Sequence, residues 1–95
     1  DPDLDAQIVR AGEHIASYQV CDWLTPVPAD VLLGRGYPGD GSIDLDRLTR
    51  QVAATGYSRD IEVEIFNADI WAADFDEVIK EVSRRYHSIV EPALA

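Results

Sequence analysis

Apolar and polar residues alternate along the first five residues of the sequence IEVEIF, positions 61–65, and Phe66 then falls on the same face as the two glutamates. Side chains two positions apart lie on the same face of a β-strand. The pattern therefore predicts a strand with one apolar face, which can pack against helices, and an opposite face that carries Glu62 and Glu64. Such a strand fits a sheet whose polar face meets water, and it equally fits a closed α/β barrel whose polar face points inward to a site.

A second strand is predicted over residues 15–22, with the sequence IASYQVCD, and three helices are predicted around the two strands. The helices cover residues 3–12, residues 44–55 and the segment from Asp74 onward. Each helix begins at an aspartate that can cap its N-terminus, and a glycine is placed to end each of the first two. In all three, apolar residues recur every three or four positions and form one face that can be buried.

A long irregular stretch, residues 23–41, follows the first strand. It holds three of the five prolines and four of the six glycines. A connection of this length in a small domain is typically functional. Its sequence PADVLLG favours a short helical turn within it.

Strands and helices alternate along the chain, which predicts that the two strands pair in parallel. In barrels built this way, sites lie at the carboxyl ends of the strands and in the loops that follow. These positions hold polar and aromatic residues that we single out as site candidates: Gln19, Asp22, Trp23, Arg35, Glu64, Asn67 and Trp71.

The chain is too short to close such a barrel by itself. An eight-stranded barrel takes about 250 residues, whereas this chain has 95. Two parallel strands alone would leave both edges of the sheet unpaired. We therefore expect residues 1–95 to be one portion of a larger barrel, or to assemble with copies of themselves. The lack of methionine also favours a piece of a longer polypeptide.

The net charge and the cysteine content limit the classes of partner and site that the chain can have. The formal net charge of -10 disfavours nucleic acid and anionic membrane surfaces, since both are bound by clusters of Lys and Arg. The single cysteine, Cys21, excludes an internal disulfide and a zinc cluster built from cysteines. No apolar run approaches the roughly 20 residues that span a bilayer. We expect a cytoplasmic protein.

The sequence YQVCDWLTPVPADVLLGRGYPGDGSIDLDRLTRQVAATGY, followed by IEVEIFN, resembles the C-terminal part of sugar phosphate isomerases/epimerases with the xylose isomerase-like TIM-barrel fold. The resemblance covers nearly the whole chain. Its most specific elements are GRGYPGDGSIDL, TGY and EVEIF, in this order and spacing. It implies that the strands are the seventh and eighth of a (β/α)8 barrel, that the first helix is the sixth, and that the segment from Asp74 forms the closing helix.

The resemblance also implies a divalent metal, manganese, magnesium or cobalt, held by side chains from strands four, six, seven and eight. Glu64 matches the glutamate ligand of strand eight, and in related epimerases it also acts as a catalytic base that moves a proton next to a carbonyl. The strand-seven ligand is typically a histidine, and Gln19 stands at that position. A glutamine carbonyl can ligate a hard cation, but it binds transition metals less well than imidazole does.

Substrate contacts are predicted for Arg35, Trp23, Asp22 and Trp71. An arginine between two glycines suits a phosphate, a carboxylate or a sugar hydroxyl, and the two indole rings can wall a sugar pocket or simply pack the loops. Other residues have structural interpretations: an ion pair for Glu62, a buried position for Cys21, a turn for Asp40, and surface positions for His14 and His87.

The leading hypothesis is a portion of a metal-dependent isomerase or epimerase that acts on a small-molecule sugar or sugar phosphate. One alternative is a dehydratase of keto-inositol type on the same scaffold. Another is a non-catalytic barrel fragment that associates with itself. The endonuclease branch of this fold is disfavoured by the acidic charge. The 95-residue chain by itself is expected to be inactive, because half of the metal ligands lie outside it.

Overall fold

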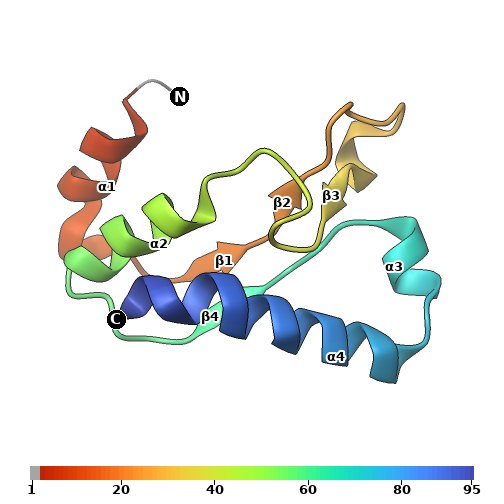
Figure 1. Cartoon of the computed structure of the whole chain (residues 1–95). Helices are drawn as coiled ribbons and strands as arrows, with labels where there is room; N and C mark the ends of the chain where they lie inside the picture. The colour runs from red at the N-terminus through yellow and green to blue at the C-terminus, as the bar shows by residue number, and fades with distance from the viewer. Residues whose placement is uncertain (1–2) are drawn as a thin grey trace.

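Two short parallel strands lie at the centre of the protein, a mixed α/β structure (Figure 1). The structure is a computed structural model and describes residues 3–95. Strand β1 (Tyr18–Val20) pairs with β4 (Ile61–Val63), with Tyr18 opposite Ile61 and Val20 opposite Val63. The predicted parallel pairing is confirmed.

The three predicted helices are present as α1 (Leu4–Ala11), α2 (Leu45–Ala54) and α4 (Phe75–Arg85). Helix α4 continues through a π-helical turn (Tyr86–Val90) and a 3₁₀ turn (Glu91–Leu94). Aspartate caps explain where α2 and α4 begin: the Asp44 carboxylate accepts from the Arg47 amide at 3.2 Å, and that of Asp74 accepts from the Glu77 amide at 3.1 Å.

Two glycines allow the chain to turn away after the first two helices. Gly12 follows α1 with a φ of 48°, and Gly56 lies two residues beyond α2 with a φ of 93°. Both values lie in the left-handed region that glycine adopts without steric cost. A 3₁₀ turn (Gly12–His14) then connects α1 to the segment that enters β1.

Both strands are shorter than the sequence pattern indicates. The predicted strand 15–22 is divided at Cys21, after which β2 (Asp22–Trp23) pairs antiparallel with β3 (Arg35–Gly36) in a separate sheet. Pairing of the IEVEIF segment ends at Val63, because β1 stops at Val20 and offers no further partner. The Glu64 amide still donates to the Val20 carbonyl at 3.1 Å.

The long loop contains more structure than its composition suggests. Besides β3 it holds the predicted helical turn (Val31–Leu33), where the Asp30 carboxylate accepts from the Leu32 amide at 3.2 Å. A further helix, α3 (Ala68–Ala72), was not predicted, and the Asn67 side chain caps it. In Figure 1, the β2–β3 hairpin and α3 lie at the end of the molecule toward which both β1 and β4 point.

The apolar faces of β1 and β4 form the core together with α2 and the C-terminal helix. Val20, Leu45 and Val90 are buried at its centre, and partly buried side chains surround them: Tyr18, Ile43, Ile61, Val63, Tyr86 and Ile89. The other face of the strand pair stays open, and Gln19, Glu62 and Glu64 are exposed on it. Helices thus cover one face of the strand pair, and the division into an apolar and a polar face is as the alternation predicts.

A partly buried hydrogen bond ties β1 to α2 beside this core. The Tyr18 hydroxyl and the Thr49 hydroxyl lie 2.9 Å apart, and Thr49 is fully buried. Burial raises the pKa of Tyr18, and the hydrogen bond from Thr49 partly opposes that rise. Within residues 3–95, no helix is long and apolar enough to cross a membrane.

Candidate functional site

A pocket of about 280 Å³ opens at the carboxyl ends of the two parallel strands. Its lining consists of Gln19, Val20, Cys21, Leu32, Arg35, Glu64 and Phe66. Three of the predicted site residues, Gln19, Arg35 and Glu64, therefore meet in one place although they are far apart in the sequence. The position agrees with the general rule that α/β sites form at the carboxyl ends of strands.

Glu64 follows β4 directly, and its backbone hydrogen bond to Val20 fixes where the side chain leaves the strand. The carboxylate is exposed, and among residues 3–95 it has no hydrogen bond or ion pair. Gln19 lies opposite Glu62 in the register, and its Nε2 donates to Glu62 Oε2 at 2.9 Å. In the described part of the chain, the partner of Glu62 is therefore an amide and not the cation that an ion pair would require.

Arg35 is held in the pocket by two side chains. Its Nη1 donates to Cys21 Sγ at 3.3 Å, and its Cζ lies 3.9 Å from the centroid of the Trp23 ring. The Nε–H is buried and finds no acceptor among residues 3–95. Cys21 was expected to be a small buried residue, but it lines the pocket and carries this contact.

The backbone of Arg35 is held by the segment that follows β4. The Arg35 amide donates to the Phe66 carbonyl at 3.2 Å, and Asn67 Nδ2 donates to the Arg35 carbonyl at 2.9 Å. Asn67, a site candidate from its place after the strand, thus both caps α3 and anchors β3. These two bonds bring the loop after β1 and the loop after β4 together around the pocket.

The two tryptophans do not line the pocket. Trp23 supports the guanidinium of Arg35 with its ring. Trp71 is 58% exposed, donates from Nε1 to the Ile65 carbonyl at 2.8 Å, and packs edge-on against Phe66 with 5.5 Å between ring centroids. In this structure both indoles support residues of the pocket wall and do not form the wall themselves.

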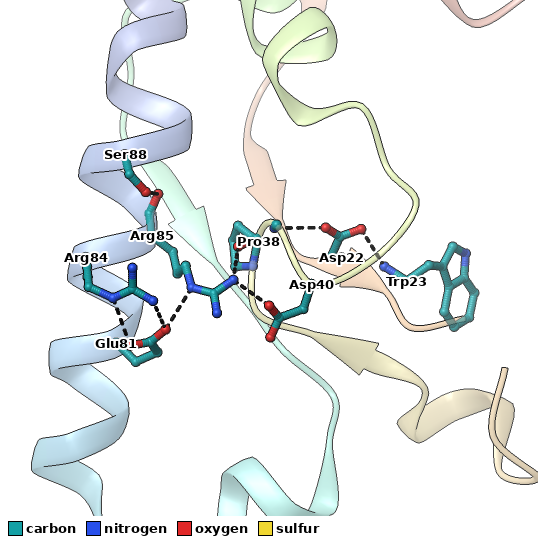
Figure 2. Close-up of polar contacts among 9 residues, drawn as sticks. Asp22, Trp23, Pro38, Asp40, Glu81, Arg84, Arg85 and Ser88 are labelled. Atoms are coloured by element: carbon teal, nitrogen blue, oxygen red, sulfur yellow. Dashed lines mark hydrogen bonds and ion pairs between the residues drawn. The ribbon is translucent and has the colours of Figure 1, made fainter. Parts of the chain in front are cut away.

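Asp22 was expected to contact the substrate, but its position differs from that expectation. Its side chain is 1% exposed, so it does not reach a ligand in the pocket. Oδ1 accepts from the amides of Trp23 and Ile43, and Oδ2 accepts from the amide of Gly39, each at 2.9 Å. Figure 2 shows this carboxylate beside the loop that follows β3. The bonds to Gly39 and Ile43 hold that loop in place. The carboxylate can be buried because three N–H groups donate to it.

Sequence reasoning missed Arg85 on α4, which grips the same loop. Its Nη1 donates to the Pro38 carbonyl at 2.8 Å and to Asp40 Oδ1 at 2.6 Å, and its Nε donates to Glu81 Oε1 at 2.7 Å (Figure 2). The Asp40 and Glu81 carboxylates raise the pKa of Arg85. The one available signal was the four-residue spacing of Glu81 and Arg85 on a helix. Nothing local pairs Arg85 with Asp40, which is 45 residues earlier.

Outside the pocket, the ionisable side chains of residues 3–95 do not form a metal site. His14 and His87 are exposed, as expected, and His87 pairs with Glu91 one helical turn later. Over residues 3–95, no group of three or more His, Cys, Asp or Glu side chains is arranged to hold a metal ion.

Comparisons with known proteins bear on the fold. No protein family model matches the chain, and no curated protein matches it. The crystal structure of protein SMc04130 from Sinorhizobium meliloti 1021 is similar to it, with 46% sequence identity and a TM-score of 0.88. The match covers 96% of this chain and 34% of that protein. This chain thus has the fold of about one third of a longer, similar protein.

Proposed function

We propose that this chain is the C-terminal portion of a xylose isomerase-like (β/α)8 barrel, and that the barrel is a divalent-metal-dependent isomerase or epimerase. The substrate is a small-molecule sugar or sugar phosphate, and the cytoplasm is its proposed location. The observation that carries the proposal is the pocket at the carboxyl ends of β1 and β4, where Glu64, Gln19 and Arg35 come together. Catalytic groups of such barrels occupy this position.

Two observations support the barrel. Within residues 3–95, β1 and β4 each pair along one edge, and helices cover only the apolar face of the pair. Further strands on both sides would complete the sheet and enclose its polar face. In addition, 96% of these 95 residues equals 34% of the similar protein, which is therefore about 270 residues long, close to the typical length of such a barrel.

The residues of the pocket fit a divalent ion in donor type. The Glu64 carboxylate is exposed and carries no ion pair in the described chain. The Gln19 amide N–H donates to Glu62, so the Gln19 carbonyl oxygen is left to act as a metal ligand. Carboxylate and amide oxygens suit Mg²⁺ and Mn²⁺. When bound, the ion would polarise the oxygen atoms of the substrate. The remaining ligands belong to strands outside this chain.

In the proposed reaction, the Glu64 carboxylate takes the proton from a carbon next to a carbonyl, which is general base catalysis. Arg35 binds an oxygen or anionic group of the substrate, since its guanidinium is already positioned by Trp23 and Cys21. A second carboxyl group, from outside this chain and in its protonated form, donates its own proton to the substrate, and Glu64 keeps the proton that it took. A dehydratase would use the same groups, but after the proton is removed a neighbouring hydroxyl group would leave as water.

A non-catalytic, self-associating fragment is the second candidate, because the described part of β1 and β4 leaves strand edges free. The two are separated by assaying a polypeptide that contains the whole barrel. With Mn²⁺, Mg²⁺ or Co²⁺ and a ketose or its phosphate in D₂O, incorporation of deuterium next to the carbonyl reports proton transfer.

Glu64→Gln should lower this rate by about 100-fold or more. Glu77→Gln is the matched control, because the Glu77 side chain is exposed on α4 and within residues 3–95 forms an ion pair only with Lys80; it should leave the rate unchanged. Full activity of Glu64→Gln would contradict the assignment of the base. Lack of metal-dependent exchange in the unsubstituted barrel, with self-association of the 95-residue chain, would favour the second candidate. The isolated chain is expected to show no exchange.

A further inference from the structure

The loop of residues 37–43 is gripped from two sides. On one side lies the buried Asp22 carboxylate, which accepts from the amides of Gly39 and Ile43. On the other side lies Arg85, which donates to the Pro38 carbonyl and to Asp40. Figure 2 shows the loop between these two groups.

Arg85 differs from the other arginine of its helical turn. Its side chain is 18% exposed, whereas that of Arg84 is 63% exposed and, among residues 3–95, bonds only to Glu81. The backbone of the loop comes close to the helix here. A Cβ placed on Gly39, whose φ is 96°, would lie 3.2 Å from Arg85 Nη1. An exposed salt bridge would contribute little, but this arginine is mostly buried against the loop.

The gripped loop follows directly on β3, which carries Arg35. Gly36 joins residues 37–43 directly to Arg35, so a shift of the loop would pull on β3 against the two bonds that hold the Arg35 backbone to Phe66 and Asn67. Trp23 lies on β2, opposite Arg35 on β3. The contact of the Arg35 guanidinium with the Trp23 ring therefore depends on where β3 lies relative to β2. Helix α4, the loop 37–43 and β3 therefore form one connected path that leads to the pocket.

We propose that Arg85 is a positioning residue: by clamping the loop 37–43 to α4, it sets the place of Arg35 in the pocket. The contacts of Arg85 and Asp22 with the loop support this positioning role. Its consequence for substrate binding rests on the proposed function. Glu81 belongs to the same device, because it accepts from Arg85 Nε and directs the guanidinium at the loop.

The test is an NMR measurement on the chain itself. Protons that lie over an indole ring are displaced upfield by its ring current, so the Arg35 side-chain resonances report the contact with Trp23. Arg85→Ala should remove at least half of this displacement. Arg85→Lys, which keeps a charged donor for Asp40 and the Pro38 carbonyl, should restore part of it. Arg84→Ala is the matched control and should leave the displacement unchanged.

Circular dichroism shows whether each variant is folded. If Arg85→Ala does not fold, Asp40→Ala replaces it, because Asp40 is partly exposed and its loss removes only one of the clamp contacts. Full retention of the displacement in the folded clamp variant, or equal loss in Arg84→Ala, would overturn the proposal.

In the whole barrel, the same clamp variants should raise KM more than they lower kcat. A barrel without activity whose Arg35 resonances still respond to Arg85→Ala would refute the proposed function and leave this inference standing. An active barrel whose Arg35 resonances do not respond would do the reverse.

Discussion

The Arg35 guanidinium lies 3.9 Å from the centroid of the Trp23 ring, so a cation stacks on an aromatic face at the edge of the candidate pocket. This contact joins the two strands of the small antiparallel sheet, in which Trp23 and Arg35 are register partners. It holds a long, flexible side chain in one place before any ligand arrives.

Replacing the Trp23 ring should weaken the fold measurably. A partly buried cation–π contact contributes about 1 kcal/mol, so Trp23→Leu should lower the free energy of unfolding by at least that amount. Trp23→Phe keeps an aromatic face and should lose less. Urea unfolding of the two variants measures the difference. Equal stability of both variants would mean that the cation–π contact contributes nothing.

Asp22→Asn should destabilise the protein through the loop and not through a ligand. The carboxylate accepts three backbone N–H groups, and an amide would turn an N–H donor toward one of them. We expect a loss of about 3 kcal/mol, since a buried donor loses its charged acceptor. Asp46→Asn is the control, because the pair of Asp46 with Arg50 is exposed and should contribute little to stability. Similar losses for the two variants in urea unfolding would contradict this role.

Gly41→Ala should be more harmful than Gly56→Ala. A Cβ on Gly41 would lie 2.0 Å from the Trp23 carbonyl oxygen and 2.6 Å from Asp22 Oδ1. The loop would have to move away from β2, at a cost of about 2 kcal/mol or more. Gly56 has open space around it, so alanine there meets only the backbone strain of a φ of 93°, about 1 kcal/mol. Thermal unfolding of both variants ranks them, and an equal or reversed order would be inconsistent with the close approach.

The Glu81 carboxylate should make stability depend on pH in the acid range. Hydrogen bonds from Arg84 and then Arg85 lower the pKa of Glu81 to about 2, from 4.5. Because the folded value lies below the unfolded value, the stabilisation is fully present above about pH 4.5 and is lost as the pH falls toward 2. The stability difference between the unsubstituted chain and Glu81→Gln should therefore shrink over this interval. A carbon-detected NMR titration of Glu81 checks the midpoint directly, and a midpoint near 4.5 would contradict the contacts.

Local patterns predicted much of the fold. The alternation in IEVEIF identified which face of β4 is apolar, and the aspartate caps placed the starts of α2 and α4. The order of elements predicted the parallel pair. These features depend on residues within a few positions of one another, which is why a sequence read by itself contains them.

The candidate site was predicted in part. Gln19, Arg35 and Glu64 were chosen from their places after the strands, and the structure brings them to one pocket. Asp22 and Trp23 were chosen by the same reasoning, yet they turn out to hold the loop and Arg35. Position along a strand indicates which residues are near a site, but it does not tell which side chains point into it.

The sequence by itself determined where the three long helices and the two parallel strands lie, which faces of the strands are polar or apolar, and the neighbourhood of the pocket, because each follows from short-range spacing. Only the tertiary structure decided that the Asp22 carboxylate is buried under the Gly39 and Ile43 amides and that Arg85 pairs with Asp40. Eighteen acidic and eight basic residues leave many pairings open in the sequence. Packing of the last helix against the loop selects among them, because a buried charge is stable only where donors or counter-charges surround it.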